Sequence, residues 1–449
     1  MTTIVWFRQD LRLQDQPALL AAAAAGAVIP VYVCDNEGAG EWRVGAAQRW
    51  WLHHSLAALD ASLRELGSRL ILRRGPAAAT LLALAEETGA GAIHAIRHYE
   101  PWWREAEAAL GERLCLHDGA HLRPPESVTT ASGGQFRMFS AFLRTLSASL
   151  PPDPSVDAPV TLMAPEHWPV SDRLADWKLL PTRPNWATGF DVWTPGEEGA
   201  HAAVDEFADT LRNYAEGRNL PSIEGTSRLS PHLHHGEISP RQVWHALTGE
   251  GEGAASFRRE LAWRDFTAGL ILGLPNYARE NGRRQFDRLQ WRRAPVDLKA
   301  WQQGRTGYPI VDAGMRQLWA TGWMHNRVRM ITASFLVKHL LIDWREGERW
   351  FWDTLVDADY GNNSVNWQWV AGTGIDANMF GRIMAPLSQS AKFNAGDYIR
   401  RWVPELRDVS DAAIHDPDEA GCRPHGYPPK IIGHREARER ALAAGRMVR

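Results

Sequence analysis

Polar and aromatic side chains that could do chemistry are concentrated between Tyr308 and Trp369. This segment contains tryptophans, arginines, two closely spaced aspartates and a His-Asn-Arg triplet, all within stretches that are otherwise apolar and helical in period. Polar groups of this kind are stable in a protein interior only when each has a hydrogen-bonding or charged partner. The segment therefore predicts a buried site for a large ligand that has both polar and aromatic parts.

The His-Asn-Arg triplet lies in the segment WMHNRVRMITASF. Side chains four residues apart share a helix face, so His325 would lie beside Arg329, and Asn326 beside Met330 on the adjacent face. A core helix whose polar groups are satisfied within the protein is the alternative for this segment taken alone.

A second polar group follows in DADYGNN, where Asp357, Asp359 and Asn363 are two and four residues apart. Carboxylates and an amide can accept and donate hydrogen bonds along the edge of a planar heteroaromatic ring. Together with the triplet, these residues favour a ligand site over an ordinary core helix.

Hydroxyls and a cation suited to an anion occur together in EGTSRLSP, at Thr226, Ser227, Arg228 and Ser230. A helix that began at the Ser-Pro pair would also present free N–H groups to an anion. An ordinary helix cap is the alternative explanation for the pair.

The elements that must position these groups fall into two classes. The first 120 residues alternate β-rich runs with Ala/Leu-rich helical segments, a pattern typical of a doubly wound parallel α/β sheet. No GxGxxG follows the first run, so a ligand of this sheet would lie beyond the strand ends at a switch point. Later segments are helical in period, with starts marked by Ser230 and Ser239 before prolines and by Gln242, which would complete a capping box with Ser239.

We therefore predict an α/β domain over residues 1–130, an interdomain connection over 131–200 and an all-helical domain over 201–449. The chain has 449 residues, more than one hydrophobic core usually serves. The connection is rich in proline and aspartate and is expected to wrap over the surface.

Composition excludes several classes of protein. The sequence contains no run of about 18 apolar residues, and its N-terminus is not a basic segment followed by an apolar one. We therefore expect neither a membrane span nor a secretory signal. The expected location is the cytoplasm. The three cysteines, Cys34, Cys115 and Cys422, are too far apart to predict a disulfide, zinc or iron-sulfur site. The net charge is -3, but residues 251–350 hold 17 Lys and Arg against 10 Asp and Glu, which suits a face that contacts phosphates. Solvated helix faces with local ion pairs are the alternative.

The run YPIVDAGMRQLWATGWMHNRVRMITASF, with DADYGNNSVNWQW after it, resembles the flavin-binding core of the DNA photolyase/cryptochrome family. The resemblance extends from WFRQDLRL near the start to FNAGDYIRRWVPEL near the end and is strongest over residues 258–407. It implies one FAD per chain, an N-terminal α/β antenna domain, a helical catalytic domain and damaged DNA as the partner of a monomer.

By this resemblance, Arg329 pairs with Asp357 beside the flavin, and Asn363 lies opposite the flavin N5, where plant-type cryptochromes usually carry Asp. A neutral amide adds no negative charge and so suits a fully reduced flavin. The implied FAD-binding residues are Tyr214, Thr226, Ser227, Arg228, Leu229, Ser230, Arg264, Arg329, Asp357, Asp359 and Asn363.

The resemblance also assigns an electron-transfer chain and a substrate face. The chain runs from Trp367 through Trp344 to Trp291, although each tryptophan alone would be interpreted as a core residue. Trp263 and Trp369 become aromatic walls for a flipped-out dimer, and Glu260 a donor to its carbonyls; a surface ion pair of Glu260 with Arg264 is the alternative. The implied catalytic residues are Glu260, Asn326 and Asn363, and the DNA-binding residues are Arg218, Glu260, Trp263, Asn326, Arg327, Met330, Trp369 and Gln389.

Short sequence motifs indicate the subclass within the family. The His-Asn pair resembles enzymes for cyclobutane pyrimidine dimers, whereas (6-4) photolyases typically show His-His. Ser364-Val365-Asn366 replaces the Asn-Gly-Gly of the commonest class I enzymes and looks more like class III bacterial photolyases. The expected function is splitting of cyclobutane pyrimidine dimers by light; a cryptochrome-type photoreceptor and a (6-4) photolyase are the alternatives. No long tail follows HREARERALAAGRMVR, which argues against the signalling members.

An antenna chromophore in the α/β domain is also implied. Methenyltetrahydrofolate is favoured by analogy with class III, with Trp50, His53 and Glu100 as its candidate contacts. Packing of a helix on the sheet explains Trp50 and His53 almost as well.

Overall fold

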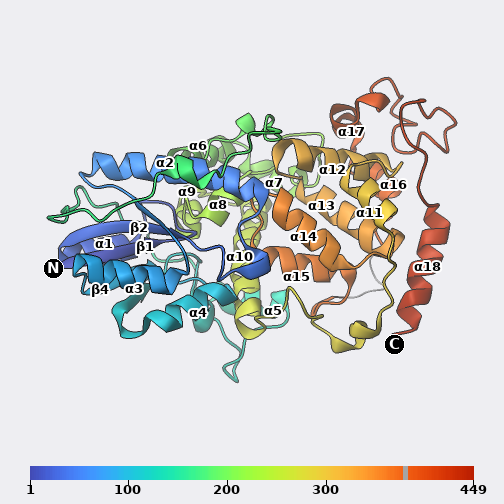
Figure 1. Ribbon diagram of the computed structural model, residues 1–449. Helices are drawn as coiled ribbons and strands as arrows, with labels where there is room; N and C mark the ends of the chain where they lie inside the picture. The colour runs from blue at the N-terminus through green and yellow to red at the C-terminus, as the bar shows by residue number, and fades with distance from the viewer. Residues whose placement is uncertain (378–382, 449) are drawn as a thin grey trace.

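The computed structural model describes residues 1–377 and 383–448. A part that contains the sheet is followed by a larger helical part (Figure 1). Residues 378–382, which belong to the family-like run after DADYGNN, lie outside the described residues.

Five parallel strands form one sheet in the order β3-β2-β1-β4-β5. β1 pairs with β2 on one side and β4 on the other, so that Thr3 is opposite both Val28 and Ala92. The strand order reverses between β1 and β4, which places the switch point beyond their carboxyl ends. The predicted doubly wound sheet is confirmed, and its strands are β1 (Thr2–Phe7), β2 (Ala27–Cys34), β3 (Ile71–Arg74), β4 (Ala92–Ile96) and β5 (Leu114–His117).

Helices cover both faces of the sheet because successive strand side chains point to opposite faces. In β1, Val5 and Phe7 pack into the core that α1 and α2 close, whereas Ile4 and Trp6 pack into the core that α3 and α4 close. These helices are α1 (Pro17–Ala25), α2 (Ala46–Glu65), α3 (Ala77–Thr88) and α4 (Pro101–Leu110).

The interdomain connection contains a helix that the sequence did not reveal. α5 (Phe139–Ser147) packs against α10 (Glu252–Gly273), and its Phe142 and Leu146 are buried. Its other residues are exposed or half-buried, so this part of the predicted surface connection is a helix that lies on the helical part. A nine-residue helix with only two fully buried positions is too short for its hydrophobic period to be recognised among prolines and aspartates.

The helical part is built around a core to which α12, α13, α14 and α15 contribute buried side chains. Helical structure after residue 201 was predicted and is confirmed. The remaining helices are α6 (Glu197–Ala208), α7 (Tyr214–Gly217), α8 (Ser230–His235), α9 (Pro240–Ala246), α11 (Pro295–Gln302), α12 (Pro309–Thr321), α13 (Asn326–Ser334), α14 (Trp344–Thr354), α15 (Tyr360–Ala371), α16 (Pro386–Lys392), α17 (Gly396–Trp402) and α18 (His434–Arg446).

The two predicted serine caps have different outcomes. The Ser239–Gln242 capping box is confirmed: the Gln242 N–H donates to the Ser239 hydroxyl over 3.0 Å, and the Ser239 N–H donates to the Gln242 amide oxygen over 2.9 Å. The cap at Ser230 is wrong, because α8 starts at Ser230 itself and the hydroxyl donates to Asp357 over 2.6 Å. A carboxylate 127 residues away is a stronger acceptor than anything near in sequence.

Among the described residues, no helix is both long enough and apolar enough to cross a bilayer. Cys34, Cys115 and Cys422 are free thiols. Over the same residues, no three His, Cys, Asp or Glu side chains gather as a metal site.

Candidate functional site

A cavity of about 680 Å³ opens in the helical part. Pockets for ligands and cofactors typically measure about 300–1,000 Å³. Its walls come from α7, the loop before α8, α10, α13 and α15, which are far apart in sequence. The predicted FAD-binding and DNA-binding residues that line it are Tyr214, Arg218, Thr226, Ser227, Arg228, Leu229, Ser230, Glu260, Trp263, Arg264, Asn326, Arg327, Arg329, Met330, Asp357, Asp359, Asn363 and Trp369.

Gln389 is the one predicted DNA-binding residue that does not belong to this lining. It is half-buried on α16.

An ion pair ties three of these walls together. The Arg329 guanidinium donates to both carboxylate oxygens of Asp357, over 3.1 and 2.8 Å, and Ser230 donates to the same carboxylate. Arg329 also donates through Nε to the Met324 carbonyl over 2.7 Å. The predicted pairing of Arg329 with Asp357 is confirmed, and it links α13, the segment between α14 and α15, and the start of α8.

The loop over residues 226–230 presents a cation without a full set of partners. Arg228 has a φ of +52°, and its guanidinium lies 4.4 Å from the ring centre of Trp193 and 5.5 Å from that of Trp323. Its Nε is buried and has no hydrogen-bond partner among the described residues, and burial lowers the pKa of Arg228. An anion at this end of the cavity would supply the missing partner.

Arg264 on α10 is a second arginine that lacks a full set of hydrogen-bond partners among the described residues. One of its Nη atoms donates to the Leu233 carbonyl over 3.0 Å, while its Nε is buried without a partner in the described part of the chain. Two such arginines, the loop hydroxyls and an aromatic wall fit a large ligand with phosphates and rings, as FAD is.

Amide and carboxylate groups of α15 form a further wall. Asp359 caps the helix by accepting the Asn362 N–H over 2.6 Å, and the Asn363 amide donates to the Glu348 carbonyl over 3.2 Å. The Glu348 side chain is buried, and burial raises its pKa well above the ordinary value. Asn363 therefore lies beside a buried carboxyl group whose protonated form is favoured by burial.

Glu260 pairs across the cavity. Arg218, directly after α7, donates to the Glu260 carboxylate. The alternative, an ion pair of Glu260 with Arg264 on the same helix, is therefore wrong. Arg264 is held instead by its bond to the Leu233 carbonyl. Burial raises the pKa of Glu260, and Arg218 opposes that shift.

Trp263 carries an aromatic partner that the sequence did not suggest. The Phe139 ring lies parallel to it, with ring centres 3.6 Å apart and an angle of 7° between the planes. Phe139 also lines the cavity.

Two family models match this chain. One is described as the FAD binding domain of DNA photolyase and matches residues 257–447, and the other is described as DNA photolyase and matches residues 3–160. A deoxyribodipyrimidine photo-lyase of Agrobacterium fabrum (strain C58 / ATCC 33970) is 50% identical, over 98% of this chain and 97% of that protein. The chain belongs to the DNA photolyase family.

Two further relatives show the breadth of the family. Cryptochrome-1 of Arabidopsis thaliana is 37% identical, over 98% of this chain and 69% of that protein. The crystal structure of a bacterial class III photolyase from Agrobacterium tumefaciens superimposes with a TM-score of 0.95 at 49% identity and covers 100% of this chain and 97% of that one. The cavity walls from α10 to α15 fall within the FAD-binding domain of the photolyase family.

The three tryptophans predicted as an electron-transfer chain occupy one core. Trp367 lines the cavity, Trp344 is fully buried, and Trp291 is half-buried. Trp344 donates to the Asn281 amide oxygen over 3.0 Å. Close packing of Trp367 on α14 requires Gly347, since a Cβ at that residue would lie 2.1 Å from the indole. The order of electron transfer from Trp291 through Trp344 to Trp367 stays a prediction.

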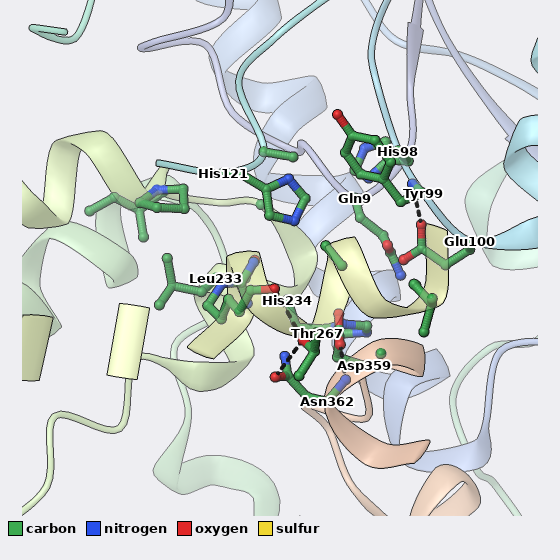
Figure 2. Close-up of a pocket in the computed structure, with 18 of the residues that line it drawn as sticks. Gln9, His98, Tyr99, Glu100, His121, Leu233, His234, Thr267, Asp359 and Asn362 are labelled. Carbon is green, nitrogen blue, oxygen red and sulfur yellow. Dashed lines mark hydrogen bonds between the residues drawn. The ribbon is translucent and has the colours of Figure 1, made fainter. Parts of the chain in front are cut away.

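A second cavity, of about 30 Å³, lies at the switch point of the photolyase sheet (Figure 2). Gln9, His98 and Glu100 approach it from beyond β1 and β4, and Asp359 and Asn362 line both this cavity and the large one. The cavity lies beyond the strand ends, where a ligand of the sheet was expected, but binding of a ligand at this switch point stays a prediction. Its size suits about one water molecule and not a chromophore.

The three antenna candidates do not share this cavity. Glu100 lines it, and burial raises the pKa of Glu100. Trp50, on α2, packs among aromatic side chains: its ring centre lies 5.2 Å from that of Phe190 and 4.5 Å from that of His54. His53 lies beside His54 on the same helix, 5.3 Å between ring centres.

Sequence reasoning missed several lining residues. Phe139, Asn362 and Asn366 line the large cavity, and His234 lines both cavities. Asn366 was within reach of a sequence argument, because it stands one helical turn from both Asn363 and Trp369. Phe139 carried no such signal, since the ring on which it stacks belongs to a helix far away in sequence.

Proposed function

We propose that this chain is a deoxyribodipyrimidine photo-lyase of class III, which uses blue light to split cyclobutane pyrimidine dimers in DNA. The observation that supports this proposal is the single cavity whose lining carries both the residues predicted for FAD and those predicted for the flipped-out dimer. Cofactor and lesion would thus share one cavity.

One set of the cavity's lining residues would hold FAD. Arg228 and the hydroxyls of Thr226, Ser227 and Ser230 would bind the pyrophosphate, with Tyr214 and Leu229 beside them. Arg264, the Arg329–Asp357 pair, Asp359 and Asn363 would bind the flavin ring. Bound, reduced FAD would supply the light-driven electron that opens the two bonds between the bases, with no net redox change.

A second set of lining residues would receive the dimer. Photolyases act on a base only after it has left the duplex, and a flipped-out base is held by stacking between aromatic side chains. Trp263 and Trp369 would form those walls. Glu260, whose pKa is raised by burial, would donate to a dimer carbonyl, and the exposed amide of Asn326 would bond to the base edge.

Arg218, Arg327 and Met330 would contact the DNA phosphates and the nucleotides around the lesion. Gln389, outside the cavity, would also contact DNA. Arg327 already donates to Asn219 and stacks over the Phe393 ring at 4.6 Å. A basic rim of this kind supplies affinity for any DNA, while the pocket supplies selection of the lesion.

The remaining parts of the proposal concern the antenna chromophore, the oligomeric state, the cellular location and the tryptophan chain. A folate, methenyltetrahydrofolate, would be the antenna, and the absorption spectrum of the purified protein tests this directly. The enzyme would act as a monomer in the cytoplasm, with Trp291, Trp344 and Trp367 carrying electrons to oxidised FAD.

The test uses purified protein with reduced FAD and DNA that contains either cyclobutane dimers or (6-4) lesions. Under blue light, thymines should reappear from cyclobutane dimers in single- and double-stranded DNA, with little action on (6-4) lesions and none in the dark. Binding to DNA without recovery of thymine under light would overturn the enzyme proposal and favour a cryptochrome.

A further inference from the structure

The stack between Phe139 and Trp263 joins the interdomain connection to the wall of the large cavity. Phe139 is the first residue of α5 and Trp263 lies within α10, and both line the cavity. Their rings are parallel, 3.6 Å apart between centres and 7° between planes. Phe266 closes the group edge-on, with ring centres 5.5 Å from Trp263 and 5.7 Å from Phe139.

The position of Phe139 is set by contacts on both sides of it in the chain. After it, Phe142 and Leu146 are buried in a core that Phe266 and Val365 share. Before it, the chain lies on α10, where a Cβ on Gly269 would come within 2.8 Å of the Gln135 amide oxygen. Figure 1 shows α5 beside α10. The connection is therefore seated on the helix that carries Trp263.

A parallel ring partner has a definite effect on the indole. It covers one face of Trp263, so that a base can stack only on the other, and it disfavours rotation of the half-buried ring. A wall that keeps its orientation loses less side-chain freedom when a base stacks on it.

We infer that Phe139 is a positioning residue, which holds Trp263 in the orientation that stacks on a flipped-out base. The interdomain connection thereby contributes to the choice of lesion over intact DNA. This inference rests on the proposed function, in which Trp263 is a wall of the dimer site.

The test compares Phe139→Leu with a matched control, Phe136→Leu. Phe136 belongs to the same segment and core and packs on Phe142 at 6.1 Å between ring centres, but it does not line the cavity. An aromatic pair of this kind corresponds to a change in affinity of about two- to tenfold. F139L should raise the Kd and KM for dimer-containing duplex by that factor, leave the repair rate at saturating substrate unchanged and leave binding to undamaged duplex unchanged. F136L should match the wild type, and Phe139→Tyr should restore the wild-type values.

A double-mutant cycle separates positioning from direct contact. In a Trp263→Ala background, F139L should have no further effect on the Kd for dimer-containing duplex, because the residue acts through Trp263. An equal loss with and without Trp263, or wild-type discrimination in F139L, would overturn the inference. FAD content per chain reports folding, and Phe139→Met, whose unbranched and flexible apolar side chain can fill an irregular gap without a ring, replaces F139L if that variant loses FAD.

Failure of the proposed function has a different signature. In that case the wild-type protein itself would restore no thymine from cyclobutane dimers under blue light, whatever its preference between dimer-containing and undamaged duplex. A wild type that prefers dimers, together with an F139L variant indistinguishable from it, would refute the role of Phe139 alone.

Discussion

Asp357 is a residue whose removal should disconnect several walls of the large cavity. Its carboxylate accepts two bonds from Arg329 and one from Ser230, and so joins α13 and α8 to the segment between α14 and α15. Asp357→Ala leaves a guanidinium and a hydroxyl without their acceptor. We expect lower thermal stability and weaker binding of oxidised FAD.

The magnitude follows from burial of the pair. Breaking a buried ion pair by removing one partner costs about 3–5 kcal/mol. The Asp357 side chain is 2% exposed, but that of Arg329 is 23% exposed and can be partly rehydrated, which favours the lower end. About 3 kcal/mol corresponds to a loss of roughly 150-fold in FAD affinity if the whole effect reaches the cofactor.

A second ion pair of the same shape provides the control. Arg316 donates to both oxygens of Glu405, over 2.7 and 3.0 Å, with side chains 22% and 31% exposed, and neither residue lines the large cavity. Glu405→Ala should lower the thermal midpoint without changing FAD affinity. The assay titrates apo-protein with FAD and follows flavin fluorescence, alongside thermal unfolding. Wild-type FAD affinity in D357A, with only a lower midpoint, would show that the pair serves stability alone.

Three further outcomes are expected. Trp291→Phe should stop light-driven reduction of oxidised FAD, followed by visible absorption, while repair after chemical reduction stays intact; loss of repair in both conditions would refute a pure relay role. Asn363→Asp replaces the amide that donates to the Glu348 carbonyl with a negative charge, so full reduction of bound FAD should slow or stop, and unchanged photoreduction would remove its assignment to the flavin N5. Burial lowers the pKa of His234 to about 3 against about 6.5 in the unfolded chain, so protons bind the unfolded state preferentially and stability should fall as the pH drops from 6.5 toward 3. His234→Asn should flatten that slope by up to about 1.4 kcal/mol per pH unit in unfolding experiments, and an unchanged slope would assign the effect to other groups.

Local patterns of the sequence determined a large part of the architecture. Alternation of β-rich and Ala/Leu-rich runs was enough to predict the parallel sheet, because each strand and helix signals itself within about ten residues. The capping box of Ser239 and Gln242 was predictable for the same reason, since both bonds span three residues. The resemblance of the segment around Arg329 and Asp357 to one family carried the prediction of their pairing, which no local pattern contains.

Only the tertiary structure decided which distant groups meet. The Glu260 carboxylate could have paired with Arg264 one turn away, but it pairs with Arg218, 42 residues earlier in the chain. Ser230 could have capped its own helix, but its hydroxyl donates to Asp357. Phe139 stacks on Trp263, an indole that belongs to a different part of the chain. Helical spacing specifies neighbours within one element, whereas these contacts depend on how α5, α7 and α10 pack, and that packing is set by the buried core as a whole.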